Sequence, residues 1–193
     1  LRAGQIVRDW LPAALQARIP PRPAVPASTT GATHVRRVVL LEGCVQPGLA
    51  PGINAAATRV LDRLGITVER AVGEQCCGAL GHHLGHTDRA LEQARPNLAA
   101  GCAALDAGAE AIVSSASACG LMVKDYGRLL GGDPDYAAQA QRVSGATRDL
   151  AELIEPEDLV RAGLFRSGGP RVAWQAPCTL QHGLKIRGVA EEL

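Results

Sequence analysis

The sequence predicts an α/β protein in which a parallel sheet is flanked by helices. Across residues 36–175, short apolar runs alternate with longer segments of helical periodicity, a pattern typical of parallel sheets with covering helices. In addition, most of the cysteines follow the end of an expected strand. The carboxyl ends of parallel strands meet at one rim of the sheet, where ligand crevices form.

The expected elements follow in order along the chain. Apolar residues at helical spacing predict an amphipathic helix over 1–19, which Pro12 should break or divide in two. The proline-rich, small and polar stretch 20–33 is expected to be a semi-extended linker. Continuous apolar runs suit strands that are buried on both faces, and strands are expected over 38–41, 66–72, 111–115 and 171–175. Helices are expected over 53–64, 79–84, 89–107, 121–130, 136–143 and 147–154.

Composition and charge exclude several classes of function. The chain has 193 residues and a formal net charge of +1, which gives no reason to expect nucleic acid or an anionic membrane surface as partner. No apolar run approaches the length of a membrane-spanning helix, and no signal peptide is visible. The apolar content is ample for a core without disulfides, so the six cysteines call for another explanation.

The most informative feature is the pair of adjacent cysteines followed by glycine, Cys76-Cys77-Gly78. Adjacent cysteines rarely pair with each other, because the short loop strains the disulfide torsion. Two thiols side by side in a turn are better suited to bind one multinuclear metal centre, and Gly78 permits a left-handed or closely approaching backbone. The candidate metal ligands, which all follow expected strand ends, are Cys44, Cys76, Cys77, Cys119 and Cys178.

Cys102 is interpreted differently. It shares a helical face with three leucines at positions 91, 98 and 105, and a free cysteine commonly behaves as a small buried hydrophobe. It is therefore expected to pack in the core.

The choice of metal lies between zinc and iron–sulfur, because thiolate-only ligation selects these two. Structural zinc usually takes short Cys-x₂₋₄-Cys knuckles, and the chain has none. Bacterial ferredoxin spacing is also absent. Adjacent cysteines would crowd a single zinc ion but can bind two different irons of one cluster. The residues therefore favour an iron–sulfur centre, with a structural or regulatory zinc–thiolate domain as the alternative.

The cysteine motifs and their surroundings resemble a known family. Cys44, Cys76-Cys77-Gly78 and Cys119-Gly120 are similar to the cysteine-rich CCG domain found in heterodisulfide reductases. The sequence resembles glycolate oxidase iron–sulfur subunits still more closely, in the stretches 41–47, 54–65, 108–112, 123–127 and 177–182. One departure is Ala116, which stands where the fuller pattern has the first cysteine of a Cys-x-x-Cys motif. Four cysteines remain for the first site, so a [4Fe–4S] cluster is expected rather than a non-cubane, five-thiolate one.

The resemblance implies an electron-transfer subunit of a glycolate oxidase or dehydrogenase complex. Flavoprotein subunits of the same complex would oxidise glycolate, and this subunit would pass electrons to an acceptor such as quinone. The chain itself would carry no catalytic residue for the substrate. The equivalent subunit of a lactate or glycerol 3-phosphate oxidising complex is an alternative. The implied location is cytoplasmic, with peripheral association with the inner membrane as an option.

Three regions are expected. Residues 1–35 form the N-terminal helix and linker, 36–169 the first CCG domain, and 170–193 the truncated start of a second CCG domain. Residues 171–178 align without gaps on 37–44, as though a strand followed by a cysteine were being restarted. Because the chain begins with Leu and ends within a helical pattern, we expect it to be a piece of a longer protein.

Several other polar residues could bind or support a metal. His82 and His86 could share a helix face and bind a metal together with His83, although a solvated face is the favoured interpretation. His182 follows Cys178 and has no assigned role. Lys124 and Tyr126 could hydrogen-bond to a cluster or compensate its charge, and a solvated helix face is an equal alternative.

Overall fold

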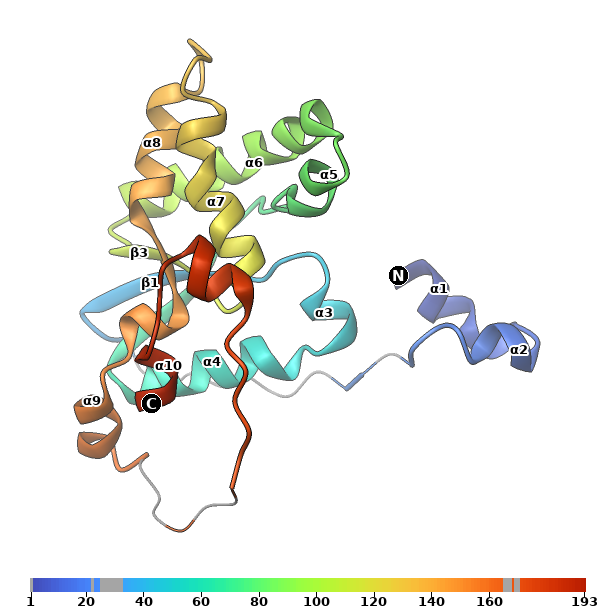
Figure 1. Ribbon diagram of the computed structural model, residues 1–193, viewed down its shortest axis with the longest axis horizontal. Helices are drawn as coiled ribbons and strands as arrows, with labels where there is room; N and C mark the ends of the chain where they lie inside the picture. The colour runs from blue at the N-terminus through green and yellow to red at the C-terminus, as the bar shows by residue number, and fades with distance from the viewer. Residues whose placement is uncertain (1, 22, 25–32, 165–167, 169–170) are drawn as a thin grey trace.

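A parallel four-stranded sheet forms the centre of the protein (Figure 1). The computed structural model describes residues 2–21, 23–24, 33–164, 168 and 171–193. The strands are β1 (Arg36–Leu41), β2 (Ile66–Arg70), β3 (Ala111–Ser114) and β4 (Thr147–Asp149). Their order is β2-β1-β3-β4, and every pairing is parallel. The predicted α/β fold is confirmed.

Helices connect the strands in three crossovers. The first contains α3 (Gln46–Leu49) and α4 (Gly52–Arg63), the second α5 (Ala79–His83) and α6 (Thr87–Asp106), and the third α7 (Ser117–Leu129) and α8 (Ala137–Ala146). Figure 1 shows α4 on one side of the sheet and α6, α7 and α8 on the other. This arrangement follows from right-handed crossovers, because the chain moves from β1 to β2 in one direction and from β2 to β3 in the opposite one.

The sheet separates two cores, as the alternation of side chains along a strand requires. Val38 and Leu40 point to the α4 side, where they pack with Leu61. Leu41 and Ile112 pack on the opposite side, among residues of α6, α7 and α8. Residues 38–41 are all buried, which explains why β1 has a continuous apolar sequence rather than an alternating one.

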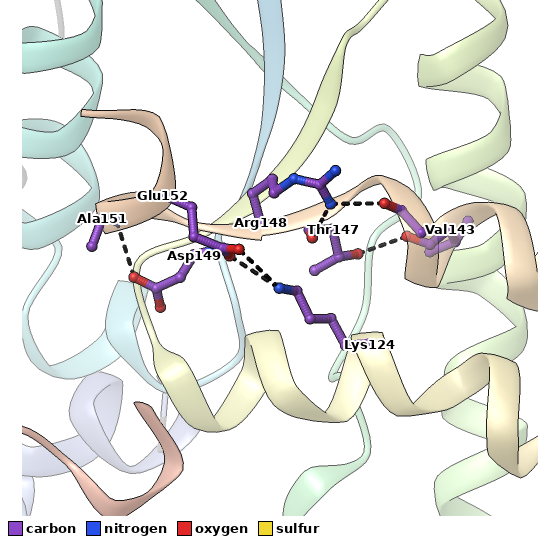
Figure 2. A network of polar contacts seen from close by, with 8 residues as sticks. Lys124, Val143, Thr147, Arg148, Asp149, Ala151 and Glu152 are labelled. Atoms are coloured by element: carbon purple, nitrogen blue, oxygen red, sulfur yellow. Dashed lines mark hydrogen bonds and ion pairs between the residues drawn. The ribbon is translucent and has the colours of Figure 1, made fainter. Parts of the chain in front are cut away.

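The predicted helix over 147–154 was wrong in its first half. Residues 147–149 form β4, the fourth strand of the sheet, whose Thr147 pairs with Ile112. A 3₁₀ helix, η2 (Leu150–Leu153), follows, with Asp149 as its cap. The Asp149 carboxylate accepts a hydrogen bond from the Ala151 N–H at 3.0 Å, and the Glu152 carboxylate accepts one from the Asp149 N–H at 2.7 Å (Figure 2).

The strand predicted over 171–175 does not form. These residues carry no regular secondary structure, and Val172 and Trp174 are 80% and 55% exposed. A strand needs a partner for its backbone groups, and the fourth strand of the sheet is β4, not this segment. The remaining C-terminal elements are α9 (Pro156–Arg161), a π-helical turn η3 (Thr179–Gly183) and α10 (Val189–Glu192).

The N-terminal helix is broken near Pro12, as predicted. The segment contains α1 (Arg2–Val7), the 3₁₀ turn η1 (Arg8–Trp10) and α2 (Ala13–Gln16). It contacts the main domain through Gln5, whose amide donates a hydrogen bond to the Gly48 carbonyl at 2.8 Å. Most of the linker predicted over 20–33 lies outside the described residues, and the division into regions 1–35, 36–169 and 170–193 stays a prediction.

In the part of the chain that the structure describes, every helix is too short or too polar to cross a bilayer.

Candidate metal centre

The candidate site lies where the strand order reverses. From β1 the chain passes to β2 on one side, and it then crosses back to place β3 on the other side of β1. In open α/β sheets, ligands bind at such a switch point, outside the carboxyl ends of the strands. Cys44 follows β1, Cys76 and Cys77 follow β2, and Cys119 follows β3, so four thiols come from three adjacent strands.

Cys44 and Cys76 form the outer pair of thiols. Their Sγ atoms are 3.3 Å apart, and both cysteines, like the other four, are free. Cys44 is exposed and Cys76 is partly buried. Partial burial of the Cys44 thiol, together with its hydrogen bond to Cys76, raises the pKa of Cys44 to about 11.

Cys77 and Cys119 form the inner pair. Cys77 is only 7% exposed, and a hydrogen bond with Cys119, followed by burial, raises the pKa of the Cys77 thiol. The same interaction lowers the pKa of Cys119. The Cys119 Sγ lies 4.0 Å from the position that a Cβ on Gly43 would take. The inner pair therefore lies against the loop that carries Cys44.

Gly78 allows the double-cysteine turn to approach α6. Its φ is +85°, and a Cβ at this position would lie 2.7 Å from the Ala90 carbonyl oxygen. No side chain fits between the two backbones at that distance, so both the left-handed conformation and the contact require glycine. The prediction that Gly78 permits an unusual backbone is confirmed.

Two buried side chains hold the backbone of the same turn from beneath. The Tyr126 hydroxyl, on α7, donates to the Cys77 carbonyl at 2.7 Å. The Asn97 amide, on α6, accepts from the Gln75 N–H at 2.7 Å and donates to the Cys76 carbonyl at 3.1 Å. Burial raises the pKa of Tyr126, which keeps the phenol protonated and therefore a donor.

For Tyr126 the sequence left two equal alternatives, support of the centre or a solvated helix face, and it did not point to Asn97. The available signal was a polar amide on the apolar face of α6, between the buried residues Ala94 and Gly101. A polar residue in such a position is informative, because buried polar groups need partners.

Polar contacts also tie the other loops together. The Glu74 carboxylate accepts hydrogen bonds from the backbone N–H groups of Glu42 and Gly43 at 3.0 and 2.9 Å, which joins the β1 and β2 loops. The Ser115 hydroxyl donates to the Asn54 side-chain oxygen at 2.7 Å, and the Asn54 amide donates to the Glu42 carbonyl at 2.9 Å. The β3 loop is thereby linked to β1.

An open cleft of about 400 Å³ lies beside the outer pair of thiols. Its walls are the β1 and β2 loops, including Cys44, Cys76 and Glu74. Arg70 and Glu42 form an ion pair at 3.1 Å on the same wall. The cleft gives solvent and small molecules access to Cys44 and Cys76.

Cys178 is exposed and precedes η3. Its segment packs on α7: the Thr179 and Ser117 hydroxyls are 2.6 Å apart, and a Cβ on Gly183 would collide with Leu121. Cys178 therefore belongs to a segment that contacts the same helix as Cys119, and its assignment as a ligand stays a prediction. Cys102 packs against the core of α6, α7 and α8, as predicted.

The histidine cluster does not share a helix face. Helix α5 ends at His83, and the chain turns at Gly85, whose φ is +82°. His86 therefore lies outside the helix that carries His82, so the two do not share the helix face on which a common metal site was considered. His182, on η3, lies 3.4 Å from the Arg187 guanidinium.

Lys124 does not contact the cysteines. It forms an ion pair with Glu152 at 3.0 Å, and this pair links α7 to η2 (Figure 2). Lys124 therefore joins α7 to η2, whereas Tyr126, two residues further along α7, donates to the Cys77 carbonyl.

The donors at the switch point fit an iron–sulfur group. They are thiols, which suit zinc or iron–sulfur. Among the described residues, no group of three or more His, Cys, Asp or Glu side chains is placed to hold a metal ion. The thiols form two contacting pairs, Cys44 with Cys76 and Cys77 with Cys119. These four thiols come from the loops after β1 and β2 and from the first turn of α7, and thiols are donors that an iron–sulfur group can use.

The comparisons with known proteins agree with this chemistry. The model of the cysteine-rich CCG domain matches residues 38–124. The glycolate oxidase iron–sulfur subunit of Escherichia coli is 42% identical over 192 residues, which are 100% of this chain and 47% of that protein. A probable glycolate oxidase iron–sulfur subunit of Bacillus subtilis is 27% identical over 147 residues, 76% of this chain and 32% of that protein. Lactate utilization protein A of Bacillus pumilus is 30% identical over 118 residues, 61% of this chain and 48% of that protein.

No solved structure matches the chain. The protein carries a cysteine-rich CCG domain. It is, more particularly, a homologue of the glycolate oxidase iron–sulfur subunit. The chain spans about half the length of the Escherichia coli relative, and its match to the Bacillus subtilis one covers about a third of that protein.

Proposed function

We propose that this chain supplies an iron–sulfur centre that carries electrons in a glycolate-oxidising complex. The observation that carries the proposal is the position of four free thiols, from the loops after β1 and β2 and from the first turn of α7, at the switch point of the sheet. The similarity to the Escherichia coli glycolate oxidase iron–sulfur subunit, which extends over the whole chain, supports both the metal and the complex.

Cys44, Cys76, Cys77 and Cys119 would hold the cluster, for which we propose the [4Fe–4S] type. Such a group supplies one-electron chemistry when it is bound. Ala116, where the fuller motif has a cysteine, caps α7, and its carbonyl accepts hydrogen bonds from the Gly120 N–H and the Ser114 hydroxyl. Without a cysteine at position 116, the proposed ligands of this site are four thiolates. Cys178 is proposed as a ligand of a second centre.

The protein's own residues set the surroundings of the centre. Cys77 is buried on the α6 and α7 side, where a low dielectric strengthens electrostatic interactions. Cys44 and Cys76 border the open cleft. Burial and solvent exposure both tune the potential of an iron–sulfur group, so one side of the site is dry and the other is accessible to an electron partner.

The proposed partners are flavoprotein subunits, which would oxidise the hydroxyacid, and an acceptor such as quinone. Glycolate is the proposed substrate of the complex, because the relative that matches the whole chain is named for it. A lactate-oxidising complex is the second candidate, favoured by several relatives named lactate utilization protein A.

The test uses the full chain in its complex, with Cys77→Ser as the variant and Cys102→Ala as the matched control. Serine is a harder and poorer ligand for iron than thiolate. We expect Cys77→Ser to leave flavin reduction by glycolate intact and to abolish reduction of the acceptor, while Cys102→Ala retains both. Stopped-flow flavin absorbance and acceptor turnover measure the two steps. Normal acceptor turnover in Cys77→Ser would contradict the proposal.

Zinc is the alternative metal, and the 3.3 Å contact between the Cys44 and Cys76 sulfurs is the observation that favours it, because two thiols in contact can share one ion. Metal analysis of the purified protein separates the two cases. A brown protein that contains iron and acid-labile sulfide supports the proposed function. A colourless protein with one zinc per chain would replace it with a structural role.

A further inference from the structure

The double-cysteine turn directs its thiols and its carbonyls to different sides. The Cys76 sulfur contacts Cys44 and the Cys77 sulfur interacts with Cys119, at the candidate metal centre. The carbonyls of the same two residues are bound by Asn97 and Tyr126. The orientation of the thiols is therefore coupled to the orientation of the carbonyls through two consecutive peptide units.

Backbone hydrogen bonds do not provide this support. Residues 74–77 belong to no helix or strand, and within the described ranges no backbone N–H donates to the carbonyl of Cys76 or Cys77. A buried carbonyl without a donor is costly, so the two side chains supply what regular secondary structure supplies elsewhere.

The two supporting side chains are themselves rigidly held. Tyr126 is fully buried and Asn97 is 6% exposed. They lie on α7 and α6, and the Asn97 amide also donates to the Tyr126 hydroxyl at 3.3 Å. Groups on packed helices, linked to one another, fix a geometry more accurately than groups on loops do.

We propose that Tyr126 and Asn97 are positioning residues that hold the Cys76–Cys77 turn in the conformation that presents both thiols to the metal centre. This inference rests on the iron–sulfur function proposed above. It assigns neither residue as a ligand: both act through the backbone carbonyls of the cysteines. Without the Tyr126 hydroxyl, the Cys77 carbonyl is free to rotate toward another donor, and the Cys77 thiol turns with it.

The experiment compares Tyr126→Phe with Thr147→Val in the full chain, reconstituted anaerobically with ferrous iron and sulfide. Tyr126→Phe keeps the ring and removes only the hydroxyl. Thr147 is the matched control, because it too is fully buried and its hydroxyl donates to a carbonyl, that of Val143, at 2.7 Å. It belongs to β4, outside the loops that carry the candidate ligands. Urea unfolding of the metal-free proteins measures the general loss of stability in each variant.

Two readouts separate positioning from stability: the rate of iron loss to a ferrous chelator and the reduction potential of the bound group. We expect Tyr126→Phe to lose iron about fivefold faster than the wild type, the factor that one net hydrogen bond provides, and to have a shifted potential. Thr147→Val should match the wild type in both. Asn97→Leu, which removes support from Gln75 and Cys76 together, should lose iron faster still.

The outcomes are distinct. Equal rates and potentials in Tyr126→Phe and Thr147→Val, with a wild type that takes up iron and sulfide, would overturn the positioning inference alone. A wild type that takes up zinc but no iron–sulfur group would overturn the proposed function, and this inference with it.

Discussion

Replacement of Gly78 by alanine should disrupt the double-cysteine turn. The loss in the free energy of unfolding can be worked out from two contributions. A non-glycine residue in the left-handed region, here at a φ of +85°, costs about 1–2 kcal/mol. The new Cβ would lie 2.7 Å from the Ala90 carbonyl oxygen, and forcing an extra carbon into a packed site costs about 1–3 kcal/mol. Gly78→Ala should therefore lower the free energy of unfolding by about 2–5 kcal/mol. This is a large share of the roughly 5–15 kcal/mol by which a typical domain is stable.

Gly85→Ala is the matched control for this substitution. Gly85 has a φ of +82°, but a Cβ there would meet nothing within 4 Å, so only the backbone cost of about 1–2 kcal/mol applies. Urea unfolding of the two metal-free variants measures the difference, and iron bound per chain after reconstitution reports on the thiols. We expect Gly78→Ala to bind little iron and Gly85→Ala to bind the wild-type amount. Equal losses of stability in the two variants would refute the close approach of the cysteine turn to α6.

Three further predictions concern charges and cysteines. The free energy of unfolding of the metal-free chain should fall between about pH 9 and pH 11. In this range an unfolded thiol, with its ordinary pKa of 9.0, releases a proton that folded Cys44, with a pKa of about 11, retains. Urea titrations at both ends of the range should show a smaller fall for Cys44→Ser than for the wild type. Lys124→Met should lower the free energy of unfolding by about 0.5–1 kcal/mol, because it breaks the partly buried ion pair with Glu152. Its iron content should equal that of the wild type. Cys102→Ala should cost about 1 kcal/mol in urea unfolding and retain full iron content; a loss of iron would contradict its role in core packing.

The sequence allowed the sheet and the neighbourhood of the cysteines to be predicted, because both depend on strong local patterns. Three strands were recognisable from apolar runs, and parallel strands of one sheet necessarily end at a common rim. This is why Cys44 and Cys76, which are distant in the chain, could be expected to meet, and their sulfurs are in contact.

The fourth strand could not be predicted in the same way. Residues 147–149 have no apolar run, and Thr147 becomes a strand residue only through its pairing with Ile112. Residues 171–175 show the opposite case: an apolar sequence similar to that of β1 remains irregular and exposed. Local pattern measures the tendency to form a strand, but the free edge of a sheet decides which segment does so.

The support beneath the cysteines depends on tertiary contacts that sequence spacing does not reveal. Tyr126 could have been part of a solvated helix face, as Lys124 two residues before it could have been. The packing of α7 against α6 and α8 gives the two residues different surroundings. It buries Tyr126 completely, and it leaves Lys124 free to form an ion pair with Glu152. The contact of Tyr126 with Asn97 joins two helices, so neither residue indicates its partner by itself.

The strand order described above also has a kinetic consequence. β1 acquires β3 as its neighbour only after the chain has passed through β2 and two crossovers, and the hydrogen bond between Gln46 and Ser115, which joins the loops of β1 and β3, spans 69 residues. Pairings of this kind form slowly, because closing a long loop lowers the entropy of the chain before the favourable contacts can form. The four thiols therefore meet late in folding. In a zinc finger the metal drives folding, whereas the iron–sulfur group proposed for this chain would enter a site that forms only after its long-range strand pairings, and the thiols would be open to oxidation until it is bound.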